Sequence, residues 1–225
     1  MAQRFDAVSL DVGGVLVVPD HGALADALDR LGVGYDRSAF GRGHYLAMAA
    51  ADRAASASED FTDYLWGFLA AVEVTEPDRR RAHDALQARL HTPIWCQPVP
   101  GSRAGVAQLV DAGVRLAVTS NSDGRVEDLL RRHEWVQVGD GPGAVVEVVT
   151  DSGIVGVAKP DARVFRATID ALALAPERVL HVGDSVHYDV EGAAAVGMQV
   201  VHMDPYELCD STDHAHVRTL GEVLD

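Results

Sequence analysis

The sequence has few cysteines, a deficit of positive charge and no long apolar run. Its two cysteines, Cys96 and Cys209, cannot build a disulfide framework, and no Cys-x-x-Cys or Cys/His cluster indicates zinc. No apolar stretch approaches the roughly 18 residues that span a bilayer, and the N-terminus lacks the apolar region of a signal peptide. We therefore expect a cytoplasmic protein that makes no contact with membranes.

Acidic residues outnumber basic ones by 34 to 19, which gives a formal net charge of −15. Nucleic acids and anionic membranes attract proteins rich in lysine and arginine, so this balance argues against both partners. A small anionic substrate stays possible, because a single cleft can be locally positive. The 225 residues suffice for one sizeable core, or a core with a small insert. Nothing in the sequence indicates the oligomeric state.

Short apolar runs that end in Gly, Asp, Ser or Asn alternate with helical patterns. The runs lack the polar–apolar alternation of half-exposed strands, as strands of a buried parallel sheet do. This alternation predicts an α/β fold with a doubly wound, Rossmann-like parallel sheet. The expected strands are Ala7–Leu10, Val114–Val118, Val179–Val182 and Met198–His202. The expected helices are Gly101–Ala112, Val126–Arg132, Ala162–Leu172 and Val190–Ala195.

Residues 17–98 differ from the rest, because they contain no strand-like run. We interpret them as an inserted helical cap domain, and residues 1–16 with 99–225 as the α/β core domain. The insert leaves the sheet just after the first strand, so we expect it to overhang the carboxyl end of that strand, where open α/β sheets bind ligands. Its amphipathic stretches are His21–Leu31, Ser38–Ala51, Ser58–Val72 and Pro77–Leu90.

Polar residues follow several of the expected strands or precede a helix. Parallel topology brings the carboxyl ends of strands to one edge of a sheet, so we expect these side chains to converge. The segments are Asp11 with Gly13 and Gly14, Thr119–Ser122 at the start of a helix, Lys159–Asp161, and Gly183–Ser185 with Asp189.

The chemistry of these residues suits a phosphate group. Ser120 and the backbone N–H groups after it can hold phosphoryl oxygens at a helix N-terminus, and Lys159 supplies positive charge. Asp184 and Asp189 can hold Mg²⁺, which prefers oxygen ligands. With its charge offset in this way, Asp11 can attack phosphorus and form an acyl phosphate.

In this order, the motifs resemble those of the haloacid dehalogenase-like superfamily, in the branch with a helical cap after the first motif. The first motif of that family reads Asp-x-Asp-x-Thr/Val-Leu/Val. The matching segments here are Asp11–Leu16, Ser120–Asn121, Lys159–Asp161 and Gly183–Asp189.

The resemblance implies an Mg²⁺-dependent hydrolase of a small phosphate ester, in which Asp11 becomes phosphorylated. It places the metal on Asp11, Asp184 and the backbone carbonyl of Gly13. It implies that Asp189 either contacts the water molecules bound to the metal or holds Lys159 in position. It assigns phosphate binding to Ser120, Asn121 and Lys159.

The chain departs from the family pattern at Gly13, where similar phosphatases carry the acid that protonates the leaving group. A well-placed general acid contributes roughly 10²–10⁴ in rate, so we expect slow turnover that favours good leaving groups. Asp20, His21 or another insert residue could supply the proton. A phosphate-binding or regulatory protein with little turnover is one alternative.

A metal-independent 2-haloacid dehalogenase is another alternative, although the Tyr and Thr usual in dehalogenases are absent at Gly13 and Val15. A phosphonate hydrolase would need a lysine in residues 17–98, which contain none. The histidines near the end of the chain, His214 and His216, show no spacing typical of metal ligands. Conceivable substrate contacts are Arg42, His44, Tyr45, Arg53, Trp66, His187 and Tyr188.

Overall fold

A computed structural model describes residues 5–54 and 62–225. The chain forms two compact units, one made of the chain up to Val17 with Pro98–Asp225 and the other of Val18–Gln97. The predicted domain boundaries differ from these by one residue. Each boundary lies within a short strand, β2 (Val17–Pro19) or β3 (Trp95–Pro98), and these two strands pair. The prediction that residues 17–98 contain no strand was therefore wrong at both ends.

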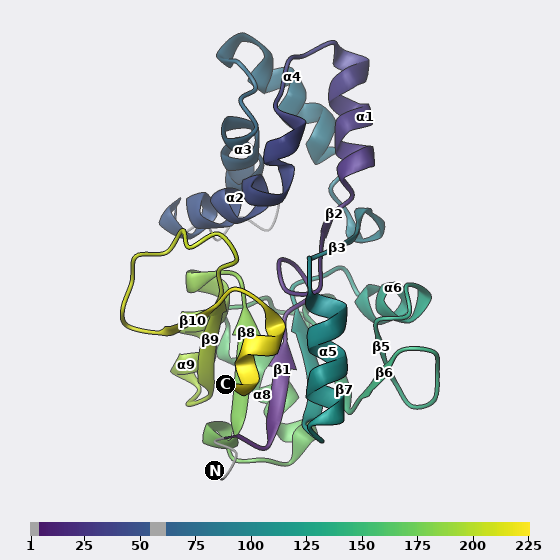
Figure 1. Cartoon of the computed structure of the whole chain (residues 1–225), viewed down its shortest axis with the longest axis vertical. Helices are drawn as coiled ribbons and strands as arrows, with labels where there is room; N and C mark the ends of the chain where they lie inside the picture. Colours follow the sequence, from purple (N-terminus) through teal and green to yellow (C-terminus); the bar gives the residue numbers. More distant parts are fainter. Residues whose placement is uncertain (1–4, 55–61) are drawn as a thin grey trace. The chain divides into compact units, whose positions relative to one another are not determined.

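The core unit is built on a six-stranded sheet in the order β10-β9-β8-β1-β4-β7, with every neighbouring pair parallel. The predicted doubly wound α/β fold is confirmed. The first strand of the chain lies between β4 and β8 (Figure 1). The six strands are β1 (Ala7–Leu10), β4 (Arg115–Ser120), β7 (Val148–Asp151), β8 (Val179–Gly183), β9 (Gln199–Met203) and β10 (Ala215–Val217).

Helices cover the sheet, with α5 in front of it and α8 behind it in Figure 1. A small sheet of β5 (Val136–Val138) and β6 (Ala144–Val146) lies outside the main one. The predicted helix Val190–Ala195 begins earlier than expected, because a π-helical segment, Val186–Glu191, precedes it. The α-helices are α5 (Ser102–Asp111), α6 (Val126–Arg132), α7 (Ser152–Val155), α8 (Ala162–Leu172) and α9 (Gly192–Ala195). Short 3₁₀ segments are Pro176–Arg178 and Leu220–Leu224.

Apolar burial fixes this arrangement. All four residues of β1 are buried, as a central parallel strand requires. One face of α8 packs Phe165, Ile169 and Leu172 against Ala7 and neighbouring apolar residues of the sheet. Burying an aromatic or aliphatic side chain of this size contributes roughly 1.5–3 kcal/mol, so this contact anchors the helix behind the strand that precedes Asp11.

The second unit is helical and has its own core. Asp20 starts α1 by accepting the Ala23 N–H at 2.6 Å. The core includes Leu28, Phe40 and Phe68, each at most 2% exposed. The predicted stretch Ser58–Val72 begins outside the described residues. The helices are α1 (His21–Leu31), α2 (Phe40–Ala54), α3 (Thr62–Ala71) and α4 (Glu76–Gln87), with 3₁₀ segments Arg37–Ala39 and Thr92–Ile94.

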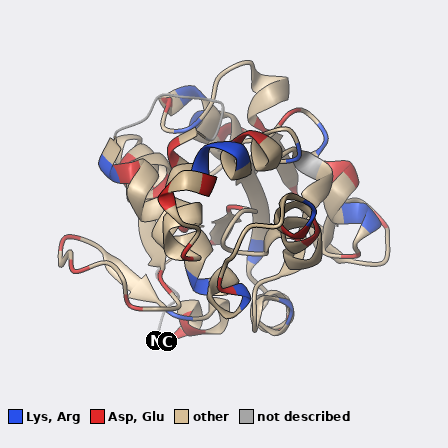
Figure 2. Cartoon of the chain, turned by 90° about the horizontal axis from the view of Figure 1, so that it is seen from above, with Lys and Arg blue, Asp and Glu red and all other residues tan. Residues whose placement is uncertain are grey.

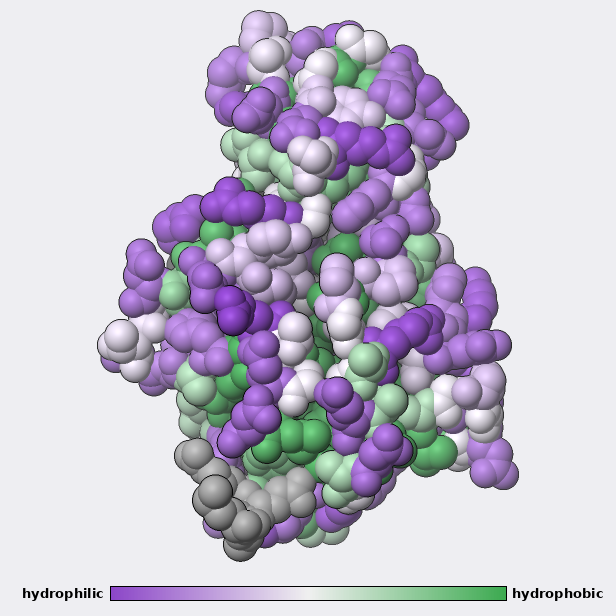
Figure 3. Space-filling view, in the orientation of Figure 1, coloured by the Kyte–Doolittle hydropathy of each residue, from purple (hydrophilic) through white to green (hydrophobic). Residues whose placement is uncertain are grey.

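Charges of both signs are spread over the helices and loops instead of collecting on one element (Figure 2). Hydrophilic residues predominate on the face in Figure 3, where apolar areas are smaller. Across residues 5–54 and 62–225, none of the helices combines the length and the apolar character that a bilayer crossing needs.

Candidate active site

The carboxyl ends of three adjacent strands place the acidic residues together. Asp11 directly follows β1, Asp184 directly follows β8, and Ser120 is the last residue of β4. Leu10 pairs with Val118 of β4 and Val182 of β8, so the three strands end in register at the same edge. The convergence that the sequence predicts therefore occurs.

Three buried carboxylates form the centre of this edge. Asp11, Asp184 and Asp189 each offer an oxygen within 4.8 Å of the others. Asp189 reaches the cluster from the π-helical segment after β8, and its Oδ2 accepts the Ser185 N–H at 3.2 Å. Oxygen ligands at this spacing suit a hard divalent cation.

Lys159 holds two of the carboxylates. Its Nζ lies 2.9 Å from Asp11 Oδ1 and 2.6 Å from Asp189 Oδ1, and it donates to the Thr119 carbonyl at 3.3 Å. It is the only lysine of the sequence and is 3% exposed. Burial alone would lower the pKa of its ammonium, but the charges of Asp11 and Asp189 raise that pKa above its usual value. Lys159 is therefore a permanent cation at this position.

The carboxylates differ in their affinity for a proton. Burial raises the pKa of Asp11 from 3.8 to about 6; Lys159 opposes this shift, and the nearby Asp189 and Asp184 charges add to it. Burial acts in the same direction on Asp189, but the Lys159 charge and the hydrogen bond from His181 outweigh it and lower the pKa of Asp189. Three carboxylates thus face one ammonium, which leaves a local excess of negative charge for a divalent cation to offset.

Two glycines make this close approach possible. Gly14 has a φ of +64°, and a Cβ on it would overlap the Asp184 carboxylate. A Cβ on Gly183 would overlap the Asp189 side chain. Gly13 is not among the positive-φ glycines in the described part of the chain. The local backbone therefore demands glycine at position 14 and not, by its φ angle, at position 13.

The segment after β4 differs from the prediction. No helix starts at Ser120, because α6 begins only at Val126. Asp151, at the end of β7, instead accepts the N–H groups of Gly124 at 3.0 Å and Val126 at 3.1 Å and so shapes this loop. The predicted helix N-terminus at Ser120 was wrong. Sequence reasoning also missed Asp151, although an acid after a Val-Val-Thr run was a usable signal.

Asn121 acts on Lys159 in this structure. Its Oδ1 accepts the Lys159 N–H at 2.7 Å, and its Nδ2 donates to the Lys159 carbonyl at 3.2 Å. Both polar groups of the Asn121 side chain are used in fixing the backbone that carries the lysine. The predicted phosphate-binding role of Asn121 stays a prediction, and Ser120 lies buried at the strand end.

A buried polar chain beneath the carboxylates was not predicted. His181 Nε2 donates to Asp189 Oδ1 at 3.0 Å, and its Nδ1 lies 3.2 Å from Ser9 Oγ. Ser9 Oγ lies 2.8 Å from Thr119 Oγ1, which continues to the Thr168 hydroxyl at 2.7 Å. Polar residues inside otherwise apolar strands were the available signal. This chain gives Asp189 Oδ1 a second donor beside Lys159.

The other residues singled out in the sequence make the following contacts within their own units. In the helical unit, His44 is buried and its Nδ1 lies 2.9 Å from the Tyr64 hydroxyl, Tyr45 is buried, and Trp66 stacks on His83. Arg42 and Arg53 are exposed. Asp20 caps α1, and burial lowers the pKa of the His21 imidazole.

In the core unit, His187 pairs with Glu191 at 3.0 Å and contacts the Tyr188 ring.

The fold and the carboxylate–lysine cluster together define a hydrolase site on a Rossmann-like sheet. A family model described as haloacid dehalogenase-like hydrolase matches residues 5–197. The chain belongs to this family.

Similar proteins include hydrolases of more than one kind. A phosphoserine phosphatase from Thermus thermophilus is 35% identical over 130 residues, which cover 57% of this chain and 48% of that protein. The solved structure of a HAD phosphatase from Thermococcus onnurineus has a TM-score of 0.59 at 18% identity, covering 97% of this chain and 96% of that one. A dehalogenase structure has a TM-score of 0.61 at 19% identity, covering 99% and 97%. The chain spans about half the length of the curated relatives it matches first. At 18% and 19% identity, the structural likenesses show the fold alone.

Proposed function

We propose that this protein is an Mg²⁺-dependent phosphohydrolase that acts on a small phosphorylated metabolite through an aspartyl-phosphate intermediate, with slow turnover. The observation that carries the proposal is the placement of the Lys159 ammonium against the Asp11 carboxylate, beside Asp184 and Asp189. The likeness to a phosphoserine phosphatase supports the reaction class.

The residues present fit Mg²⁺. The donors are carboxylate oxygens, their combined charge exceeds that of Lys159, and the Gly14 backbone approaches Asp184 closely. Asp11, Asp184 and the Gly13 carbonyl would hold the ion, and Asp189 would act through water or through Lys159. When bound, the ion offsets the negative charge of the phosphoryl group and of the nucleophile.

Asp11 is held in a defined orientation for attack. Its Oδ1 accepts the Val12 N–H at 2.7 Å and faces Lys159 at 2.9 Å. These contacts fix the rotation of the carboxylate and leave Oδ2 clear of both donors. Oδ2 would form the new bond to phosphorus while the bond from phosphorus to the alcohol oxygen breaks. Water then attacks the acyl phosphate and releases inorganic phosphate, which restores Asp11.

The chain lacks a general acid at position 13, where glycine has no side chain. The leaving alcohol oxygen would then depart without a well-placed proton, at a cost of roughly 10²–10⁴ in rate. Alkyl phosphates depend on this proton more than aryl phosphates, because alkoxides are stronger bases. We therefore expect a preference for aryl or acyl phosphates. Selection among small phosphorylated metabolites would fall to the helical unit, and the cytoplasmic location stays a prediction.

The test is hydrolysis of p-nitrophenyl phosphate and of a sugar phosphate, with and without Mg²⁺. We expect metal-dependent turnover of the aryl ester and much slower turnover of the sugar ester. Asp11→Asn should abolish both, whereas Asp111→Asn, an exposed acid at the end of α5, should leave both intact. Brisk and equal turnover of the two esters would remove the leaving-group preference. Activity that persists in Asp11→Asn would remove Asp11 from the mechanism.

The glycine at position 13 favours a second candidate, a phosphate-binding or regulatory protein with little turnover. Beryllium fluoride with Mg²⁺ should bind at Asp11 in either case, but multiple turnovers occur only in an enzyme. A dehalogenase would instead release halide from a 2-haloacid without any metal.

A further inference from the structure

A second cluster of potential metal ligands lies at the far edge of the core sheet. It consists of His202 on β9, Cys209 in the following loop, and His214 and His216 at β10. One ligand atom from each residue lies within 4.8 Å of the other three. His202 and His216 are register partners across the two strands, and their ring centroids are 5.3 Å apart.

The spacing of the atoms matches a tetrahedral site. His214 Nε2 lies 3.4 Å from His202 Nδ1 and 3.8 Å from Cys209 Sγ. With metal–nitrogen bonds of about 2.05 Å and a metal–sulfur bond of about 2.3 Å, tetrahedral geometry puts these pairs about 3.3 Å and about 3.6 Å apart. Contraction by a few tenths of an ångström would therefore bring these two pairs to tetrahedral spacing.

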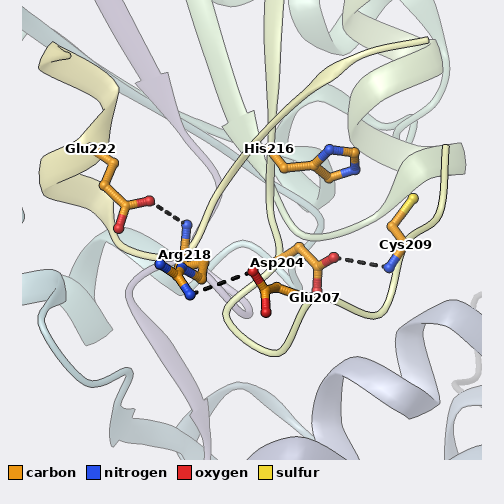
Figure 4. Close-up of a pocket in the computed structure, with 6 residues that line it drawn as sticks. All are labelled: Asp204, Glu207, Cys209, His216, Arg218 and Glu222. Carbon is orange, nitrogen blue, oxygen red and sulfur yellow. Dashed lines mark hydrogen bonds and ion pairs between the residues drawn. The ribbon is translucent and has the colours of Figure 1, made fainter. Parts of the chain in front are cut away.

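The surroundings hold two of these residues in place. His202 is buried, and its Nε2 donates to the Asp184 carbonyl at 3.1 Å, which directs the Nδ1 lone pair toward the cluster. The buried Asp204 carboxylate accepts the N–H groups of Leu208 and Cys209, both at 2.9 Å. Figure 4 shows the Asp204–Cys209 bond beside a pocket of about 310 Å³, with Cys209 and His216 among its lining residues.

We propose that His202, Cys209, His214 and His216 bind one tetrahedral transition-metal ion of the zinc type. Imidazole and thiolate donors favour such ions over Mg²⁺, which prefers oxygen. Four protein ligands leave no open position, so the ion would be structural and would fasten the loop between β9 and β10.

Nothing in the linear pattern of residues indicates this site. The four residues are spread over fifteen positions without a short repeat, and His214 and His216 lack a typical spacing. They meet because β9 and β10 pair in parallel and the intervening loop folds back onto them. The sequence contains no Cys/His cluster with the spacing of a zinc motif, but the fold brings one cysteine and three histidines together.

The full-length protein can be tested directly with Co²⁺, which reports geometry by its absorption. The titration is made in excess Mg²⁺, so that the carboxylate site is already filled. We expect one tight equivalent, with the intense visible bands of tetrahedral cobalt and a thiolate-to-cobalt charge-transfer band. Cys209→Ser should abolish the charge-transfer band, and His214→Ala should weaken binding on the order of 100-fold or more. The matched controls are Cys96→Ser and His91→Ala, which lie outside the cluster.

Two outcomes would overturn the proposal. One is a wild-type titration without a charge-transfer band or without a tight equivalent, which needs no variant to interpret. The other is a tetrahedral spectrum that Cys209→Ser and His214→Ala leave unchanged. Zn²⁺ should also raise the melting temperature of the wild type more than that of His214→Ala, since a ligand that binds only the folded state stabilises it. None of these measurements depends on the phosphatase activity.

Discussion

Gly14 lies so close to Asp184 that a single methyl group on the glycine would overlap the carboxylate. The turn that follows Asp11 and the acid that follows β8 are thus packed backbone against side chain. The glycine φ of +64° adds a second constraint, because left-handed backbone costs other residues roughly 1–2 kcal/mol.

Gly14→Ala should therefore displace Asp184 and weaken Mg²⁺ binding by roughly tenfold or more, which corresponds to about 1.4 kcal/mol. Gly32→Ala is the matched control, since Gly32 has the same φ of +64° but nothing lies within 4 Å of a Cβ added to it. Isothermal titration with Mg²⁺ and thermal melting would compare the two. Equal Mg²⁺ affinity in both variants would contradict the steric role of Gly14.

Gly13→Asp should increase the turnover of alkyl phosphates. It installs a carboxyl group where the proton donor is missing, and general acid catalysis contributes roughly 10²–10⁴ in rate. We expect the gain to be larger for a sugar phosphate than for p-nitrophenyl phosphate. Gly13→Asn is the control, because it has the same shape and cannot transfer the proton. Equal gains in the Asp and Asn variants would show that the proton is not what the site lacks.

Lys159→Gln should destabilise the metal-free protein. It leaves Asp11 and Asp189 buried without their ammonium partner, and breaking a buried ion pair costs roughly 3–5 kcal/mol. Mg²⁺ should recover part of this loss, because it supplies positive charge to the same carboxylates. Urea unfolding with EDTA and with Mg²⁺ measures both effects. Arg163→Gln, which removes an exposed ion pair with Asp161, should change stability by less than about 1 kcal/mol.

The stability of the metal-free protein should depend on the protonation of Asp11. Its pKa rises from 3.8 to about 6 on folding, so the folded state binds this proton more tightly than the unfolded state. The contribution is complete below about pH 4 and is lost as the pH rises to about 6, by about 3 kcal/mol. Asp189, whose pKa is lowered, acts in the opposite direction.

Asp11→Asn isolates this effect, because asparagine cannot ionise. The difference in unfolding free energy between this variant and the wild type, measured in EDTA, should grow in favour of the variant between pH 4 and pH 6. A difference that stays constant over that range would contradict the raised pKa. Saturating Mg²⁺ should reverse the order, since the ion favours the ionised carboxylate.

The sequence was a reliable guide where the site depends on strand ends. Asp11 and Asp184 each follow a short apolar run that could hardly be anything but a buried strand, and parallel pairing then forces them together. The helix Ala162–Leu172 was also placed correctly, because Asp161 caps it and its apolar face is regular.

The remainder depends on contacts between residues far apart in the chain. The loop after Ser120 takes its shape from Asp151, on a strand that the predictions did not include. His181 appeared to be one more residue of an apolar run, and only the register of β1 and β8 brings it beside Ser9. The contact of the Asn121 side chain with the backbone of Lys159 joins residues 38 positions apart, which the local sequence pattern does not reveal.

Because Lys159 is the only lysine of the sequence, it can be labelled selectively for spectroscopy. Feeding cells isotopically enriched lysine would label one side chain of this sequence, and that side chain lies between Asp11 and Asp189. The nuclear magnetic resonance signal of this one nitrogen would report protonation of the adjacent carboxylates, binding of a metal ion and binding of a phosphoryl group. The rest of the spectrum would need no assignment.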